Sequence, residues 1–117
     1  MTEKITDKST RKKVLEAVKT NGWELMFASE KLRNDREIIL AAVSNVGWAL
    51  KFASEELRND KDVVLTAVKR RGVDLAYASE RLKDDIEIVM DAVKENDLAL
   101  KYASKHMQEY LTMEGVV

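Results

Sequence analysis

Hydrophobic and polar positions along the chain return with a period of 25 residues. In each period an apolar cluster ends in Ala-Val, and after a short gap a second run follows with the spacing L-x-x-A-S. The fullest copy is GWALKFASEELRND, from Gly47 to Asp60. Self-similarity at a fixed period of roughly 20 to 50 residues is typical of stacked supersecondary units. The pattern therefore predicts a tandem array.

Each period reads as two short helices joined by a turn. The first helix carries a wide apolar cluster, in the second unit Ile38, Ile39, Leu40, Ala42 and Val43. The cluster does not alternate, which argues against a buried strand. The sequence predicts an all-α fold, an α-helical solenoid of four 25-residue helix-turn-helix repeats. We divide the single repeat domain, residues 1–117, into units 9–33, 34–58, 59–83 and 84–108 and a C-terminal extension, 109–117.

Residues that favour helix ends flank these runs. The first helices are expected to begin at capping residues Ser9, Asn34, Asn59 and Asp84. An acidic residue follows three positions later in units two to four, at Glu37, Asp62 and Glu87, where it suits the helix dipole. Gly22, Gly47 and Gly72 stand at the turn, where we expect a left-handed backbone conformation. Asp97 replaces glycine in the fourth unit, so this turn should be the most strained or differently shaped.

The Ala-Ser pair of the second run is identical in all four units. It occurs at Ala28-Ser29, Ala53-Ser54, Ala78-Ser79 and Ala103-Ser104. Such small side chains predict a close approach of two helix axes. The serine hydroxyl is expected to bond the carbonyl four residues back.

The two ends differ from the middle of the array. Lys13 stands where Ile38 stands in the second unit, which predicts a polar outer face on the terminal repeat. We expect residues up to about Thr6 to be poorly ordered. At the other end the last helix should continue through Leu111, with Tyr110, Leu111 and Met113 covering the open end of the stack. If they do not, this tail could join two molecules end to end as a homo-oligomer.

Composition narrows the classes of function. Charged residues make up 35% of the 117 residues, but the net charge is only −1, so a strong field toward nucleic acid or an anionic membrane is not indicated. The absence of cysteine excludes disulfides and thiolate metal sites. No apolar run approaches the roughly 18 residues that span a bilayer. Because the first residues lack the apolar stretch of a secretory signal, we expect a cytoplasmic location and no membrane partner.

Candidate catalytic groups are few. The single histidine, His106, occupies a position that holds Lys31, Glu56 and Arg81 in the other units, which is typical of a solvated site. Adjacent acids, Asp84-Asp85 and Glu55-Glu56, do not face each other on a helix. The chain has no glycine-rich phosphate loop, dinucleotide fingerprint or metal-ligand spacing. We therefore expect no catalytic residue, no cofactor and no metal site, and a protein that is not an enzyme.

Candidate partner contacts come from two features of the repeat. Trp23 and Trp48 lie one repeat apart; packing between repeats is the favoured interpretation, and a binding hot spot is the alternative. Stacking would also align columns of charge, a basic one at Arg33, Arg58 and Lys83 and an acidic one at Glu30, Glu55 and Glu80. Such columns either complement helix ends on a solvated face or select a charged partner.

The repeated strings resemble a known family. NDREIILAAV (Asn34 to Val43) and GWALKFASEEL (Gly47 to Leu57) are similar to a tandem-repeat family catalogued only as a domain of unknown function, in which strings like NDREVVLAAV and NGxALxYASEELRND alternate. The resemblance covers residues 9–108 and departs from the pattern at Asp97 and from Lys105 to Tyr110. It implies the repeat fold and brings no activity, cofactor or catalytic residue.

An extended solenoid surface without a catalytic constellation favours a non-enzymatic protein–protein interaction module, with another protein as partner. Two alternatives remain open. A deep pocket between the second helices would favour a small-ligand-binding or enzymatic domain. A basic face would favour a weak nucleic-acid binder, although nucleic acid is not the expected partner, and the candidate column is Arg11, Arg36 and Lys61.

Overall fold

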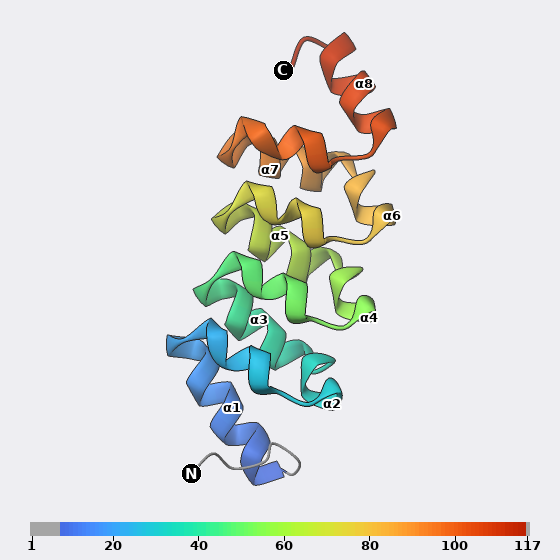
Figure 1. Ribbon diagram of the computed structural model, residues 1–117. Helices are drawn as coiled ribbons and strands as arrows, with labels where there is room; N and C mark the ends of the chain where they lie inside the picture. Colours follow the sequence, from blue (N-terminus) through green and yellow to red (C-terminus); the bar gives the residue numbers. More distant parts are fainter. Residues whose placement is uncertain (1–7, 117) are drawn as a thin grey trace.

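The computed structural model of the protein describes residues 8–116 as a rod of stacked helices, 54 × 22 × 18 Å (Figure 1). The repeat prediction is confirmed, because the regular structure in this range is helical and its elements return every 25 residues. The expected disorder up to Thr6 lies outside the described residues. The elements, in which η marks a 3₁₀-helix, are α1 (Lys8–Thr20), η1 (Gly22–Phe27), α2 (Glu30–Arg33), α3 (Arg36–Asn45), η2 (Gly47–Phe52), α4 (Glu55–Arg58), α5 (Lys61–Arg70), η3 (Gly72–Tyr77), α6 (Glu80–Lys83), α7 (Ile86–Glu95), η4 (Asp97–Tyr102) and α8 (Lys105–Met113).

Stacking of equivalent elements builds the core. Each long helix, α1, α3, α5 and α7, packs on the next, and each 3₁₀-helix contacts the next one. The short helices α2, α4 and α6 follow one another along one edge of the rod (Figure 1). Leu25, Leu50 and Leu75 are fully buried between these layers. No unit could bury its apolar face alone, so the core is continuous through the array.

The expected second helix is divided into a 3₁₀-helix and a one-turn α-helix. Ala53 and Ser54 are extended between η2 and α4, with ψ angles of 157° and 161°. The Ser54 N–H donates to the carbonyl of Arg33 in the preceding repeat at 3.0 Å, so it cannot continue the helix. Ala53 is buried, as the small-residue argument requires. The role predicted for the serine was wrong: the Ser54 hydroxyl caps α4 by accepting from the N–H of Leu57.

The glycines are needed for close packing and not for a left-handed turn. Gly22, Gly47 and Gly72 all have negative φ angles. A Cβ atom built on Gly47 would lie 2.9 Å from the carbonyl oxygen of Ala67 in the next repeat, closer than side chains normally come. Asp97 is not strained, because no further repeat packs against it and its φ is also negative. The predicted distortion of this turn was therefore wrong.

The caps of the long helices lie one residue beyond their predicted positions. Asp35, Asp60 and Asp85 are the N-caps of α3, α5 and α7, and each accepts from the N–H three residues later. Helix α1 already begins at Lys8, so Ser9 lies inside it. The predicted caps Asn34, Asn59 and Asp84 end the preceding short helices instead.

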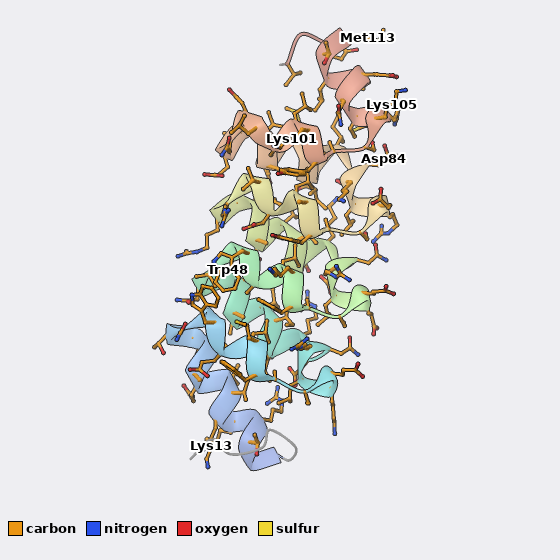
Figure 2. All side chains as sticks on the ribbon, in the orientation of Figure 1. Lys13, Trp48, Asp84, Lys101, Lys105 and Met113 are labelled. Atoms are coloured by element: carbon orange, nitrogen blue, oxygen red, sulfur yellow. The ribbon has the colours of Figure 1, made fainter. Side chains whose placement is uncertain are left out.

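The ends of the rod agree in part with the prediction. Lys13 is exposed near the N-terminal end, where its counterpart Ile38 is buried (Figure 2). Helix α8 continues to Met113, and Leu111 is 1% exposed. Tyr110 is largely exposed and Met113 is 86% exposed, so of the three predicted capping residues only Leu111 covers the stack. Among residues 8–116, none of the helices combines the length and apolar character required to cross a membrane.

Candidate partner-binding groove

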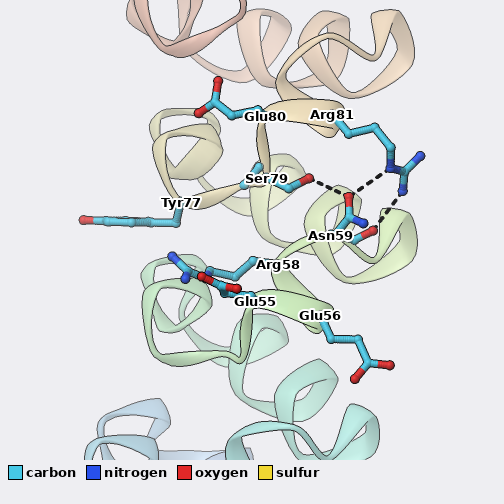
Figure 3. A pocket seen from close by; sticks show the side chains of 9 residues that line it. Glu55, Glu56, Arg58, Asn59, Tyr77, Ser79, Glu80 and Arg81 are labelled. Carbon is cyan, nitrogen blue, oxygen red and sulfur yellow. Dashed lines mark hydrogen bonds between the residues drawn. The ribbon is translucent and has the colours of Figure 1, made fainter.

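Two cavities of about 560 and 510 Å³ lie at successive junctions between repeats, beside the short helices. Figure 3 shows the larger one. Equivalent residues line both: Arg33 and Asn34 of one repeat face Phe52 and Ser54 of the next, and 25 residues later Arg58 and Asn59 face Tyr77 and Ser79. Glu55 and Glu56 line both cavities. The two cavities therefore form one groove that repeats with the period of the sequence.

An aromatic residue ends every 3₁₀-helix. These residues are Phe27, Phe52, Tyr77 and Tyr102. The extended Ala-Ser pair that follows turns the chain toward the preceding repeat. Phe52, Tyr77 and Tyr102 remain half-buried, and Phe52 and Tyr77 line the groove. This column of aromatic side chains was not predicted from the sequence. The available signal was an aromatic side chain at every 25th position.

The predicted basic column lies in this groove. The Arg33 guanidinium donates to the carbonyl of Met26 at 2.8 Å and lies 5.9 Å from the ring centroid of Phe52. The Arg58 guanidinium has no ion-pair or hydrogen-bond partner within residues 8–116, and its Nε atom is buried. Lys83 lies 3.5 Å from Glu80. Arg33 and Arg58 therefore lie between repeats without a carboxylate partner.

A serine–asparagine bond crosses each junction beside the cavities. The hydroxyls of Ser54 and Ser79 donate to the side-chain oxygens of Asn34 and Asn59 at 2.6 Å. The amide NH₂ groups of Asn34 and Asn59 have no acceptor in the described part of the chain. Each junction thus offers a free donor next to an aromatic ring.

The fourth unit repeats this bond with an acid. Asp84 accepts from the hydroxyl of Ser104 at 2.6 Å and lies 3.0 Å from Nδ1 of His106. The hydrogen bond from Ser104 is the main cause of a lowered pKa of the Asp84 carboxyl, and the hydrogen bond with His106 lowers this pKa further. His106 is exposed, as expected of a solvated position. No group of three or more His, Asp or Glu side chains among the described residues is arranged to hold a metal ion.

A second basic column, Arg11, Arg36 and Lys61, joins the repeats on the long-helix side. Each cation lies between two carboxylates of the next repeat, and the three pairs of acids are Asp35 and Glu37, Asp60 and Asp62, and Asp85 and Glu87. We call these contacts the ion-pair ladder. The closest nitrogen–oxygen distances are 2.5, 2.9 and 2.9 Å.

The ion-pair ladder shifts the pKa values of its aspartates and of its cations. Burial, the largest single effect, would raise the pKa of Asp35 and Asp60, but hydrogen bonds from Arg11 and Arg36, hydrogen bonds from backbone N–H groups and the charge of the arginines together outweigh it and lower both values. The hydrogen bonds that each cation makes to its two carboxylates raise the pKa of Arg11, Arg36 and Lys61. The column considered for nucleic acid is therefore neutralised within the chain. Ile86 holds the equivalent position in the fourth unit, where no further repeat offers acids.

The two tryptophans contact each other across the first junction. Their ring centroids are 4.3 Å apart at 62°, and Trp48 also meets Phe52 edge-on at 5.9 Å. Trp48 is half-buried, whereas Trp23 is 55% exposed. The contact agrees with packing between repeats, and the exposed indole leaves an apolar surface next to the groove.

One buried acid gave no signal in the sequence. Asp74, on η3, is 1% exposed and its Oδ2 atom has no hydrogen-bond partner in the described region. Burial raises its pKa to about 6, while Arg71, at 3.8 Å, lowers the pKa and Glu95 raises it further. The same repeat position holds Ala49 and Ala99 in the neighbouring units. Because this carboxylate is buried against Gly47, its charged form destabilises the junction between the two repeats.

Comparison with protein families identifies the family of these repeats. The family described as "Domain of unknown function (DUF4116)" matches three times in tandem, over residues 10–58, 35–75 and 60–108. The chain belongs to this family. The resemblance noted in the strings is thus confirmed, and the structure shows how DUF4116 repeats of this chain stack. No curated protein and no solved structure matches the chain.

Proposed function

We propose that this chain is a non-enzymatic protein-interaction module that binds an extended segment of another protein along the groove. The observation that carries the proposal is the recurrence of the same lining at successive junctions. Packed helices lie roughly 8 to 10 Å apart, and an extended chain advances roughly 3.3 Å per residue. About three residues of a bound segment would therefore correspond to one junction.

The groups that line the groove suit a polypeptide. The free NH₂ groups of Asn34 and Asn59 can donate to backbone carbonyls, which a peptide offers at every residue. The half-buried rings of Phe52 and Tyr77 offer apolar faces to side chains between these carbonyls. Regular spacing of both kinds of contact favours an extended segment over a compact small molecule.

Two observations favour this function over the alternatives. Ser79, the serine of the larger cavity, accepts from the N–H of Leu82 and donates to the side chain of Asn59, so its hydroxyl is not hydrogen-bonded to a base that could activate it. The cations of the ion-pair ladder are each paired with two acids, which weakens the case for a nucleic-acid surface.

Site-specific photo-crosslinking tests the proposal. A benzophenone amino acid at Glu56, which lines both cavities, should capture short, contiguous stretches of partner proteins when cells that produce the variant are irradiated. The same group at Lys94, exposed on α7 and outside both cavities, is the matched control. Mass spectrometry identifies the captured residues. Equal capture from both positions, or capture from Lys94 alone, would contradict the proposal.

A further inference from the structure

The aromatic rings of the groove differ in whether the chain itself supplies them with a cation. The ammonium of Lys51 lies 5.3 Å from the ring centroid of Phe52, and that of Lys101 lies 5.1 Å from the ring of Tyr102. In η3 the residue at this position is Ala76. Within the described residues Tyr77 therefore has no cation over its ring. An ammonium or guanidinium over such a ring is attracted by its negative face.

Three carboxylates line the cavity that contains Tyr77. Glu55, Glu56 and Glu80 are exposed there (Figure 3). Glu55 and Glu56 form no ion pair within residues 8–116, and Glu80 pairs with Lys83 at 3.5 Å. With Arg58 and Arg81 as its two cations, the lining of the cavity has a net negative charge.

The cations of this cavity are less available to a partner. Arg81 is held by Asn59, since it donates to the side-chain and backbone oxygens of that residue, both at 2.9 Å. Arg58 is half-buried, with its Nε atom covered. Neither arginine forms an ion pair with Glu55, Glu56 or Glu80, so these carboxylates can attract a cationic side chain from a partner.

We propose that the Tyr77 cavity binds one lysine or arginine side chain of the extended segment, a proposal that rests on the function proposed above. At the neighbouring junctions Lys51 and Lys101 already cover the rings, so a second and third cation would be repelled there. The expected segment carries a single basic residue, with uncharged or acidic residues about three positions to either side. Tyr77 thus sets the register of the segment on the solenoid.

Fluorescence anisotropy with synthetic peptides tests this inference. The probe is a labelled, neutral, extended peptide with one central lysine, compared with the same peptide carrying glutamate or leucine at the centre and with one carrying lysine at every third position. We expect the single-lysine peptide to bind tightest. Ala76→Lys should weaken its binding about tenfold, because the chain then supplies the cation itself.

Matched variants separate this effect from charge and folding. Lysine already occupies the position of Ala76 in η2 and η4, so Ala76→Lys should fold normally. Ala76→Gln adds bulk without charge, and Asp97→Asn makes the same change in net charge outside both cavities; both should bind like the parent chain.

The outcomes distinguish the two proposals. If the leucine or glutamate peptide binds tightest and Tyr77→Ala weakens it, the groove function stands and the cation site is wrong. Equal affinity of the parent chain and Ala76→Lys for the single-lysine peptide also overturns the cation site. If no peptide binds and crosslinking from Glu56 fails as well, both proposals fall.

Discussion

The ion-pair ladder and the groove both contain a column of cations at 25-residue spacing, yet the two columns differ in what surrounds them. Arg36 in the ladder touches two carboxylates of the next repeat. Arg58 in the groove touches none and lies in a cavity with an aromatic ring and exposed glutamates. A regular column of charge therefore does not by itself mark a binding surface. The difference lies in whether the next repeat supplies the counter-charge.

This contrast assigns stability to one side of the junction and recognition to the other. The ladder side also contains the aspartate N-caps, and the glycines pack against the other end of the long helices, so substitutions at both places should cost stability. The groove side holds charges without internal partners, so substitutions there should leave stability nearly unchanged. The first two predictions below each compare a junction residue with a matched residue that lacks a junction contact.

The largest effect is expected at the glycine contact. Gly47→Ala places a methyl group against the carbonyl of Ala67 and the carboxylate of Asp74, and should lower the free energy of unfolding by about 3 kcal/mol or more. Asp97→Ala, at the same repeat position but facing no further repeat, should change it by less than about 0.5 kcal/mol. Urea denaturation followed by circular dichroism measures both. Equal effects would show that the glycine is not required for close packing.

A smaller effect is expected for the ladder acids. Asp60→Ala removes the N-cap of α5 together with the partner of Arg36, and should lower the free energy of unfolding by about 2 kcal/mol. Glu55→Ala, in the groove, removes no ion pair and should cost less than about 0.5 kcal/mol. The urea midpoints of the two variants, measured at one pH, show which substitution costs more stability. A costlier Glu55→Ala would reverse the assignment of roles.

The pH dependence of stability should show opposite signs for two sets of acids. Burial raises the pKa of Asp74 to about 6, so the folded state binds more protons than the unfolded state between about pH 4 and 6, and stability falls as pH rises through this range. Asp35 and Asp60 have lowered pKa values, so their contribution is present above about pH 4 and is lost below it. Stability should therefore be greatest near pH 4.

Asp74→Asn isolates the first of these effects. At pH 7.5 the variant should be more stable than the parent chain by about 1 to 2 kcal/mol, because the buried carboxylate is no longer charged. Its stability should be nearly flat between about pH 5 and 7.5. Thermal unfolding across this range provides the measurement. A parent chain whose stability rises with pH over this interval would contradict the assignment.

The sequence predicted features that depend on period and composition. The helical array, the buried leucines and the polar Lys13 face follow from apolar spacing and from differences between repeats. Features set by contacts between repeats were predicted less well. Either residue of an Asn-Asp pair can cap a helix, and only the pairing of Asp60 with Arg36 shows which one does. A run of six mostly apolar residues, as in each 3₁₀-helix here, has no sequence pattern that separates a 3₁₀-helix from an α-helix.

Only some of the residues that line the groove could be predicted from the sequence. Arg33, Arg58 and Lys83 were identified because a charged column is visible in the repeat. Phe52 and Tyr77 were not, because an aromatic residue in an apolar run normally indicates core. Their half exposure depends on the extended Ala-Ser pair that follows, whose serine bonds to the preceding repeat.

The most direct test of the groove is a nuclear magnetic resonance titration of the ¹⁵N-labelled chain with a segment captured from position 56. We predict that amide shifts concentrate at Phe52, Tyr77 and Ser79 and that the amides of Arg36 and Lys61 hardly move. Shifts concentrated on the ion-pair ladder, with Tyr77 unchanged, would contradict the assignment of recognition to the groove.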